Sequence, residues 1–209
     1  MNTNEILLRR GLLLEYLTLG WNIVGAIVIL TAAMAAGSVA LAGFGLDSLI
    51  EIGASTVVIW QLKGVGKQRE RLALRLIGAS FFALAAYVLV QSGRSLWTQT
   101  HPAISPVGIV WLALTSVVML ALAAGKARTG AELGNPVLQT EARVTVVDAY
   151  LAGCVLVGIA LNATLGWWWA DPIASLVIVF YGFKEGRHAW AEGTPAPYER
   201  LRQDDSDEF

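Results

Sequence analysis

The sequence predicts an all-α membrane protein with six transmembrane helices and both termini in the cytoplasm. Apolar residues make up 56% of its 209 residues and charged residues only 15%, below the roughly 25% usual in soluble domains. Apolar runs of about 20 residues, the length needed to cross a bilayer, recur along the chain. Lysine and arginine gather on alternate connections between these runs. These features exclude an ordinary soluble domain and favour one polytopic membrane domain.

The positions of the apolar runs and of the positive charges define the topology. We expect membrane spans at residues 12–35, 39–62, 73–92, 106–125, 143–165 and 171–187. Fourteen of the fifteen Lys and Arg residues, including Lys126, precede the first span, lie in or beside the second and fourth connections, or flank or follow the last span. Only Arg94 lies on the opposite side. Because cytoplasmic loops carry the excess of positive charge, both termini are predicted to be cytoplasmic.

The remaining composition narrows the class of protein further. We divide the chain into a cytoplasmic N-terminus (1–11), a six-helix membrane domain (12–187) and a short acidic tail (188–209) that is expected to be disordered. Cys154 is the only cysteine, which excludes a disulfide framework and a thiolate metal cluster. The basic connection after the second span is expected to touch anionic lipid headgroups and not nucleic acid.

Two carboxylates in the second span are the strongest functional signal. Asp47 and Glu51 interrupt an apolar run, and their four-residue spacing stacks them on one helix face. Asp47 is about 12 Å from the outer end of this span, near the middle of the bilayer. Unpaired charges at this depth cost at least a few kcal/mol. The pair therefore predicts an intramembrane cation site, and the alternative is a polar cluster satisfied by neighbouring helices.

The fifth span supplies a third acid at comparable depth. Asp148 approaches the middle of the bilayer from the cytoplasmic side, with Thr145 three residues and Glu141 seven residues earlier on the same helix face. A purely structural role is the alternative for Asp148. We expect Asp47, Glu51 and Asp148 to be the metal ligands.

The first span offers weaker candidates. Asn22 lies about 10 Å deeper than Glu15 and is either a hydrogen-bonding residue of the helix packing or a ligand. Glu15 is expected either to reach for water at the interface or to line an inner vestibule with Glu141. The weaker ligand candidates are thus Asn22, Thr145 and Glu141.

The sixth span begins with residues typical of a helix start. Asp171 suits an N-cap and Pro172 suits the first helical turn, with metal entry as the alternative role of Asp171. Glu185 and His188 at the other end are expected to be solvated at the cytoplasmic surface.

Three buried acids on two helices form an oxygen-rich cavity that suits a divalent cation. Because carboxylates must be ionised to bind a metal, the arrival of the cation would expel protons. A site that faces the two sides of the membrane in turn could exchange metal for protons. This mechanism needs no nucleotide, and the sequence contains no phosphate-binding loop.

The residues 46–55, which read LDSLIEIGAS, resemble the second-helix signature of the cation diffusion facilitator family, the zinc and manganese antiporters. In that family the helix carries two acids, or a histidine and an aspartate, four residues apart. The segments 141–153, 169–174 and 185–186 are similar to the family's fifth and sixth helices. The resemblance covers residues 12–187 and implies efflux of a divalent metal by antiport with protons.

The sequence departs from the family pattern in two places. The family usually carries His-x-x-x-Asp on the fifth helix, where Asp148 matches the aspartate and Val144 occupies the histidine position. The resemblance implies zinc as the transported metal. Zinc favours nitrogen and sulfur ligands, however, whereas oxygen ligands suit Mn²⁺, so the all-oxygen ligand set leaves manganese open. No counterpart of the family's cytoplasmic metal-binding domain follows Gly186. We therefore expect a short form, with a homodimer through the membrane helices.

Taken together, the sequence predicts a proton-coupled exporter of zinc or manganese, multi-pass in a bacterial inner membrane or a plasma membrane. We expect no enzymatic activity and no resident cofactor. The expected partners are the transported cation, protons, the lipid bilayer and a second copy of the chain. The alternative is a non-transporting membrane metal sensor or assembly partner that retains the metal-binding helix bundle.

Overall fold

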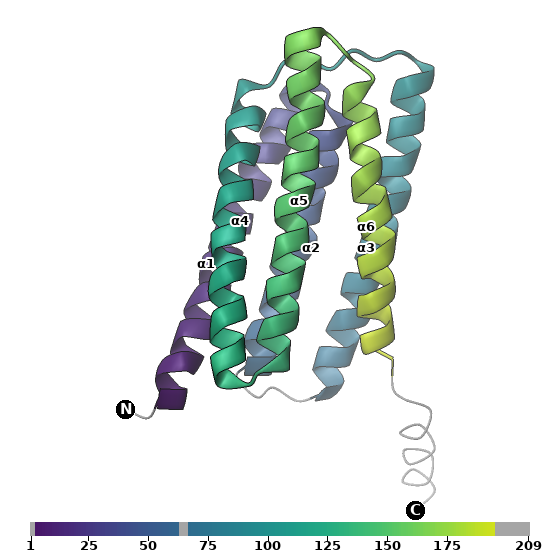
Figure 1. The fold of residues 1–209 in the computed structure, drawn as a ribbon. Coiled ribbons are helices and arrows are strands. Elements are labelled where there is room, and N and C mark those ends of the chain that lie inside the picture. Colours follow the sequence, from purple (N-terminus) through teal and green to yellow (C-terminus); the bar gives the residue numbers. More distant parts are fainter. Residues whose placement is uncertain (1–2, 63–66, 195–209) are drawn as a thin grey trace, which may run out of the picture.

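The computed structural model describes residues 3–62 and 67–194, and this part of the chain contains helices and short connections but no strand (Figure 1). The helices are α1 (Thr3–Ala36), α2 (Val39–Leu62), α3 (Lys67–Trp97), α4 (Pro106–Leu133), α5 (Pro136–Leu165) and α6 (Ala170–Glu192). The predicted all-α membrane fold is confirmed. Most of the predicted acidic tail, residues 195–209, lies outside the described residues.

Several helices extend beyond the predicted spans, and local capping explains where two of them start and stop. The Ser105 side chain accepts a hydrogen bond from the Gly108 N–H at the start of α4, and Gly134 ends this helix in the left-handed conformation, with φ 60°. Asn135 then caps α5 by accepting from the Leu138 N–H. At the other end of the domain, α6 continues to Glu192, so the first residues of the predicted tail are helical.

Five helices, α1 to α5, are long and apolar enough to cross a membrane by length and composition. α6 is not among them because charged residues lie near its two ends, Asp171 at the start and Lys184, Glu185 and Arg187 toward the finish. Its 23 residues nevertheless span about 35 Å. The first residues of α1 and the last residues of α6 lie at the same end of the bundle, as an even number of crossings requires (Figure 1).

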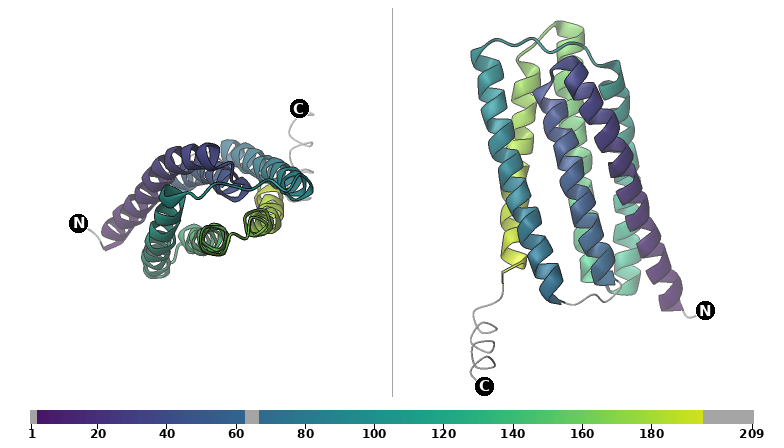
Figure 2. Two further views of the ribbon diagram at one scale, coloured as in Figure 1. Left: turned by 90° about the horizontal axis from the view of Figure 1, so that it is seen from above. Right: turned by 180° about the vertical axis from the view of Figure 1, so that it is seen from behind.

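The helices form two rows of three. Seen from above, α1, α2 and α3 make one row, and α4, α5 and α6 make the facing row (Figure 2). Across the two rows, α1 packs on α4, α3 packs on α6, and α2 contacts both α5 and α6. The two central helices, α2 and α5, are the ones that carry the acids singled out in the sequence.

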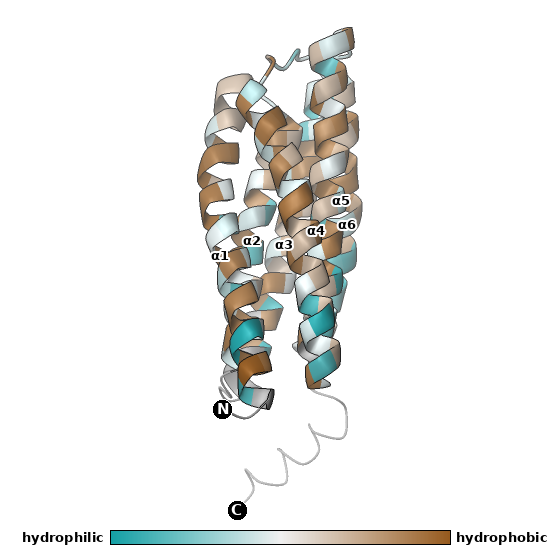
Figure 3. Cartoon of the chain, turned by 60° about the vertical axis from the view of Figure 1, so that its left-hand side comes forward, coloured by the Kyte–Doolittle hydropathy of each residue, from teal (hydrophilic) through white to brown (hydrophobic). Residues whose placement is uncertain are grey.

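The apolar residues divide between a packed interior and a lipid-facing exterior. Leu41, Phe44 and Val155 are among the buried side chains of the main core. Large apolar side chains such as Val117 (69% exposed) and Val90 (67%) cover the outside. Such an exterior suits hydrocarbon and not water. Hydrophilic segments are concentrated toward the end of the bundle where the chain begins (Figure 3).

Asp171 differs from its predicted role, because it caps a neighbouring helix and not its own. The N-cap position of α6 is Trp169, which makes no side-chain capping bond. The Asp171 carboxylate instead accepts hydrogen bonds from the Ser38 hydroxyl and from the backbone N–H groups of Val39 (3.0 Å) and Ala40 (3.3 Å). These groups form the N-terminus of α2, where free N–H donors favour an anion. Asp171 thereby joins α6 to α2 at the end of the bundle opposite to the chain start.

Candidate metal centre

The three predicted ligands, Asp47, Glu51 and Asp148, line one cavity. The cavity has a volume of about 10 Å³, which is about the space of one water molecule. It lies among four helices and is lined by Asp47 and Glu51 of α2, Phe81 of α3, Val144, Val147, Asp148 and Leu151 of α5, and Tyr181, Gly182 and Glu185 of α6. The cavity has room for a single ion-sized particle beside these four carboxylates.

Helix geometry explains why the acids converge. Asp47 and Glu51 are one turn apart on α2, and Asp148 faces them from α5, which packs on α2 in the opposite row. All three side chains are buried, with exposed fractions of 3 to 6%. Negative charges buried together in this way call for a positive partner.

The carboxylates share the cavity without surrounding a single point. Within the described residues, no group of three or more His, Cys, Asp or Glu side chains is arranged to hold a metal ion. The structure therefore shows the acids around one space, and the assignment of individual ligands stays a prediction.

Glu185 was predicted to be solvated, and this prediction is wrong. Its side chain is only 17% exposed and lines the same cavity as Asp47 and Glu51. Its carboxylate lies 3.9 Å from Nδ1 of His188, which is 66% exposed as expected for a surface residue. Glu185 follows Gly182 by three residues and shares its helix face, and Gly182 also lines the cavity.

The weaker ligand candidates lie outside the cavity lining. Asn22 is 3% exposed, and its Nδ2 has no hydrogen-bond acceptor among the described residues. Thr145 and Glu141 instead contact Lys126, a residue whose position differs from the prediction. Lys126 was expected at the fourth connection, but it lies inside α4 and its side chain is completely buried.

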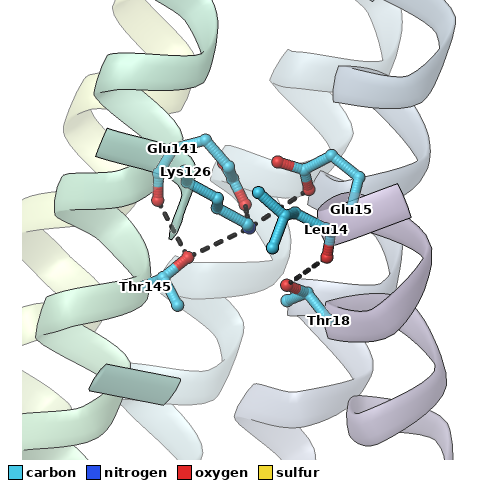
Figure 4. A network of polar contacts seen from close by, with 6 residues as sticks. All are labelled: Leu14, Glu15, Thr18, Lys126, Glu141 and Thr145. Atoms are coloured by element: carbon cyan, nitrogen blue, oxygen red, sulfur yellow. Dashed lines mark hydrogen bonds and ion pairs between the residues drawn. The ribbon is translucent and has the colours of Figure 1, made fainter. Parts of the chain in front are cut away.

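Lys126 joins three helices through its ammonium group (Figure 4). Its Nζ lies 3.2 Å from Oε2 of Glu15 on α1, 3.3 Å from Oε1 of Glu141 on α5 and 3.1 Å from Oγ1 of Thr145. Glu15 is completely buried, so its predicted role as an interfacial residue that reaches for water is wrong. We call Glu15, Glu141, Thr145 and Lys126 the lysine network.

The sequence reading missed the lysine network because the end of α4 was placed too early. The predicted span ended at residue 125, whereas α4 continues to Leu133 and carries Lys126 about two turns inside the helix. The signal that could have revealed it is electrostatic, because Glu15 within the first apolar span and Glu141 beside the fifth need a cation if they are buried.

The lysine network and the cavity influence each other electrostatically. The charges of Glu141 and Lys126 act on both Glu51 and Asp148. Glu141 and Asp148 lie on the same face of α5, about two turns apart. Lys126 and Glu141 thus connect the lysine network electrostatically to the cavity.

Comparison with known proteins identifies relatives of this chain. Residues 16–195 match the family described as cation efflux transmembrane domain. A "Cadmium, cobalt and zinc/H(+)-K(+) antiporter" of Bacillus subtilis (strain 168) is 25% identical over 138 residues. The match covers 62% of this chain and 43% of the relative, so it spans less than half of that protein's length.

Proposed function

Since this chain belongs to the cation efflux family, also called cation diffusion facilitators, we propose that it carries a divalent metal cation across the membrane. The observation that carries this proposal is the convergence of Asp47, Glu51 and Asp148 on one buried cavity. Together with Glu185, which lines the same space, these acids favour a cation as the occupant. A multi-pass membrane protein with such a site is suited to transport and not to enzymatic catalysis.

The proposed substrate is zinc, with manganese as the second candidate. The relative in Bacillus subtilis is described as an antiporter of cadmium, cobalt and zinc, which supports a soft or intermediate divalent ion. The cavity lining supports a harder ion, because it offers carboxylates and no imidazole or thiolate. Asp47, Glu51 and Asp148 are the proposed ligands. Asn22 is the remaining weaker candidate, since Glu141 and Thr145 already contact Lys126.

We further propose that export of the metal is coupled to the entry of protons. In the absence of metal, protons can take the place of the cation on the carboxylates that share this cavity, because their mutual repulsion opposes simultaneous ionisation. Binding of the cation requires ionised ligands and releases these protons. Exposure of the cavity to each side of the membrane in turn then exchanges metal for protons. Among the described residues the acids do not surround one point in this conformation, so binding requires the carboxylates to move toward the ion.

We also propose an orientation of the bundle and a membrane in which it resides. The excess of Lys and Arg at one end of the bundle supports a cytoplasmic location of that end. A bacterial inner membrane or a plasma membrane is the proposed location. A homodimer through the membrane helices stays a prediction.

Metal flux into proteoliposomes tests the proposal. Purified protein is reconstituted in vesicles loaded with a fluorescent metal indicator, and Zn²⁺, Mn²⁺ or Cd²⁺ is added outside. Transport predicts a rise of the internal signal above that of protein-free vesicles for at least one ion. Binding of an ion to the purified protein without flux would favour the alternative of a metal sensor and would contradict the proposed transport.

A further inference from the structure

The lysine network has the composition of a cation-binding site. Glu15, Glu141 and Thr145 direct oxygen atoms toward one point, and the Nζ of Lys126 occupies that point at 3.1 to 3.3 Å from each oxygen (Figure 4). The oxygens come from α1 and α5, and the ammonium comes from α4. The positive charge at their centre belongs to the chain itself.

The hydroxyl of Thr145 is oriented as a cation ligand would be. Thr145 Oγ1 donates its hydrogen to the backbone carbonyl of Glu141 at 2.9 Å. The lone pairs of the same oxygen therefore face Nζ, which approaches at 3.1 Å. A metal ion requires the same arrangement of lone pairs.

The hydrogen bonds of the network leave one carboxyl oxygen without a donor. One ammonium faces two carboxylates, and Oε1 of Glu15 is buried without a hydrogen-bond donor among the described residues. This oxygen is a second observation that points to a cation, since a buried acceptor without a partner is costly. A divalent ion would balance the two carboxylates, which the single charge of Lys126 does not.

We propose that Glu15, Glu141 and Thr145 form a second divalent-cation site, which the ammonium of Lys126 keeps filled. The lysine holds the cytoplasmic ends of α1, α4 and α5 together and prevents this acid pair from retaining the transported ion. Removal of the ammonium leaves two carboxyl groups and a hydroxyl oxygen facing one point, and a divalent ion that binds there displaces any protons on the two acids. Metal–oxygen distances of about 2.0–2.6 Å then require the oxygens to move inward by about 1 Å, within the reach of two flexible glutamates.

The experiment compares the number of Mn²⁺ ions bound per chain, measured by electron paramagnetic resonance of free Mn²⁺ in detergent solution. Lys126→Met is expected to bind one more ion than the wild type. The triple variant Lys126→Met, Glu15→Gln, Glu141→Gln lacks the two carboxyl groups as well and is expected to bind as many ions as the wild type. Equal numbers for the wild type and Lys126→Met would overturn the proposal.

Two further measurements distinguish binding at this second site from an effect on folding and from binding in the central cavity. If Lys126→Met is stable only with metal, Mn²⁺ should raise its melting temperature more than that of the wild type, and an equal shift would overturn the proposal. In an Asp47→Asn background, the additional ion of Lys126→Met should persist. The additional ion bound by Lys126→Met is measured without transport. A protein that fails to transport metal can therefore still pass or fail the test of the second site.

Discussion

The Nζ of Lys126 lies 3.2 Å from the Oε2 of Glu15, a residue 111 positions earlier in the chain. Both side chains are completely buried, so this contact is an ion pair inside the bundle and not at its surface. It links α4 to α1, while the contact of Lys126 with Glu141 links α4 to α5. Removal of one partner of a buried ion pair leaves the other charge without compensation, so substitutions of Lys126 measure what the pair contributes to stability.

Lys126→Ala is expected to destabilise the protein in metal-free buffer. The substitution leaves two buried carboxylates without a cation, at a cost of about 3–5 kcal/mol. The melting temperature in detergent with a chelator should therefore fall. The triple variant Lys126→Ala, Glu15→Gln, Glu141→Gln removes the charges together and should recover most of the loss. A melting temperature of Lys126→Ala equal to the wild type would show that the network adds no stability.

Gly78→Ala tests the close crossing of α3 and α6. A Cβ atom at Gly78 would lie 2.9 Å from the backbone oxygen of Gly186 and 2.9 Å from the backbone nitrogen of Trp190. The helices must separate to accept it, and such overpacking costs ~1–3 kcal/mol. Gly93→Ala on the same helix is the matched control, because a Cβ there meets nothing within 4 Å. The melting temperature should fall for Gly78→Ala alone, and equal effects of the two changes would contradict this packing.

Val144→His should shift the selectivity of the cavity toward zinc. Val144 lines the cavity on α5, one turn before Asp148, so a histidine there adds an imidazole beside the carboxylates. Zinc gains more from a nitrogen ligand than manganese does. We expect the ratio of zinc to manganese affinity to rise about tenfold, equivalent to about 1.4 kcal/mol, in competition binding.

Val146→His is the control for this change. Val146 lies on the same helix but lines a different groove, between α4 and α5. Its substitution should leave the ratio unchanged. A rise in the ratio with Val146→His, or none with Val144→His, would place the binding site elsewhere.

The affinity for metal should decrease as the pH falls. Protons compete with the cation for the ionised carboxylates, so each proton displaced on binding weakens the affinity by about tenfold for each pH unit below the range in which the ligands are ionised. Titration calorimetry with Mn²⁺ in buffers of different ionisation enthalpy measures the number of protons released. Binding without proton release would contradict proton coupling at this site.

The six-helix fold and the convergence of three acids were predictable from the sequence because both depend on local rules. Apolar runs define spanning helices, and helical periodicity with depth places Asp47, Glu51 and Asp148 together. Lys126, Glu15 and Glu185 were predicted at the membrane surface but point into the bundle. All three lie near helix ends, where a charged side chain can either reach the interface or turn inward. Only the packing of neighbouring helices decides between these outcomes, and one chain without its fold does not contain that information.

The same limit explains the different role of Asp171. The pair Asp171-Pro172 is typical of a helix start, and α6 does begin there. The N-terminus of α2, however, offers its free N–H groups to the same carboxylate. The proximity of two helix starts that are far apart in the chain is a tertiary feature and is not visible in local sequence.

The claim that the carboxylate cavity carries the transported cation is tested most directly by metal flux in proteoliposomes of four proteins. These are the wild type, Asp47→Asn, Asp148→Asn and the control Glu132→Gln, which neutralises an exposed acid of α4 outside the cavity. We expect Zn²⁺ or Mn²⁺ flux with opposite proton movement in the wild type and Glu132→Gln, and loss of both in the other two variants. Unchanged flux in Asp47→Asn and Asp148→Asn would contradict it.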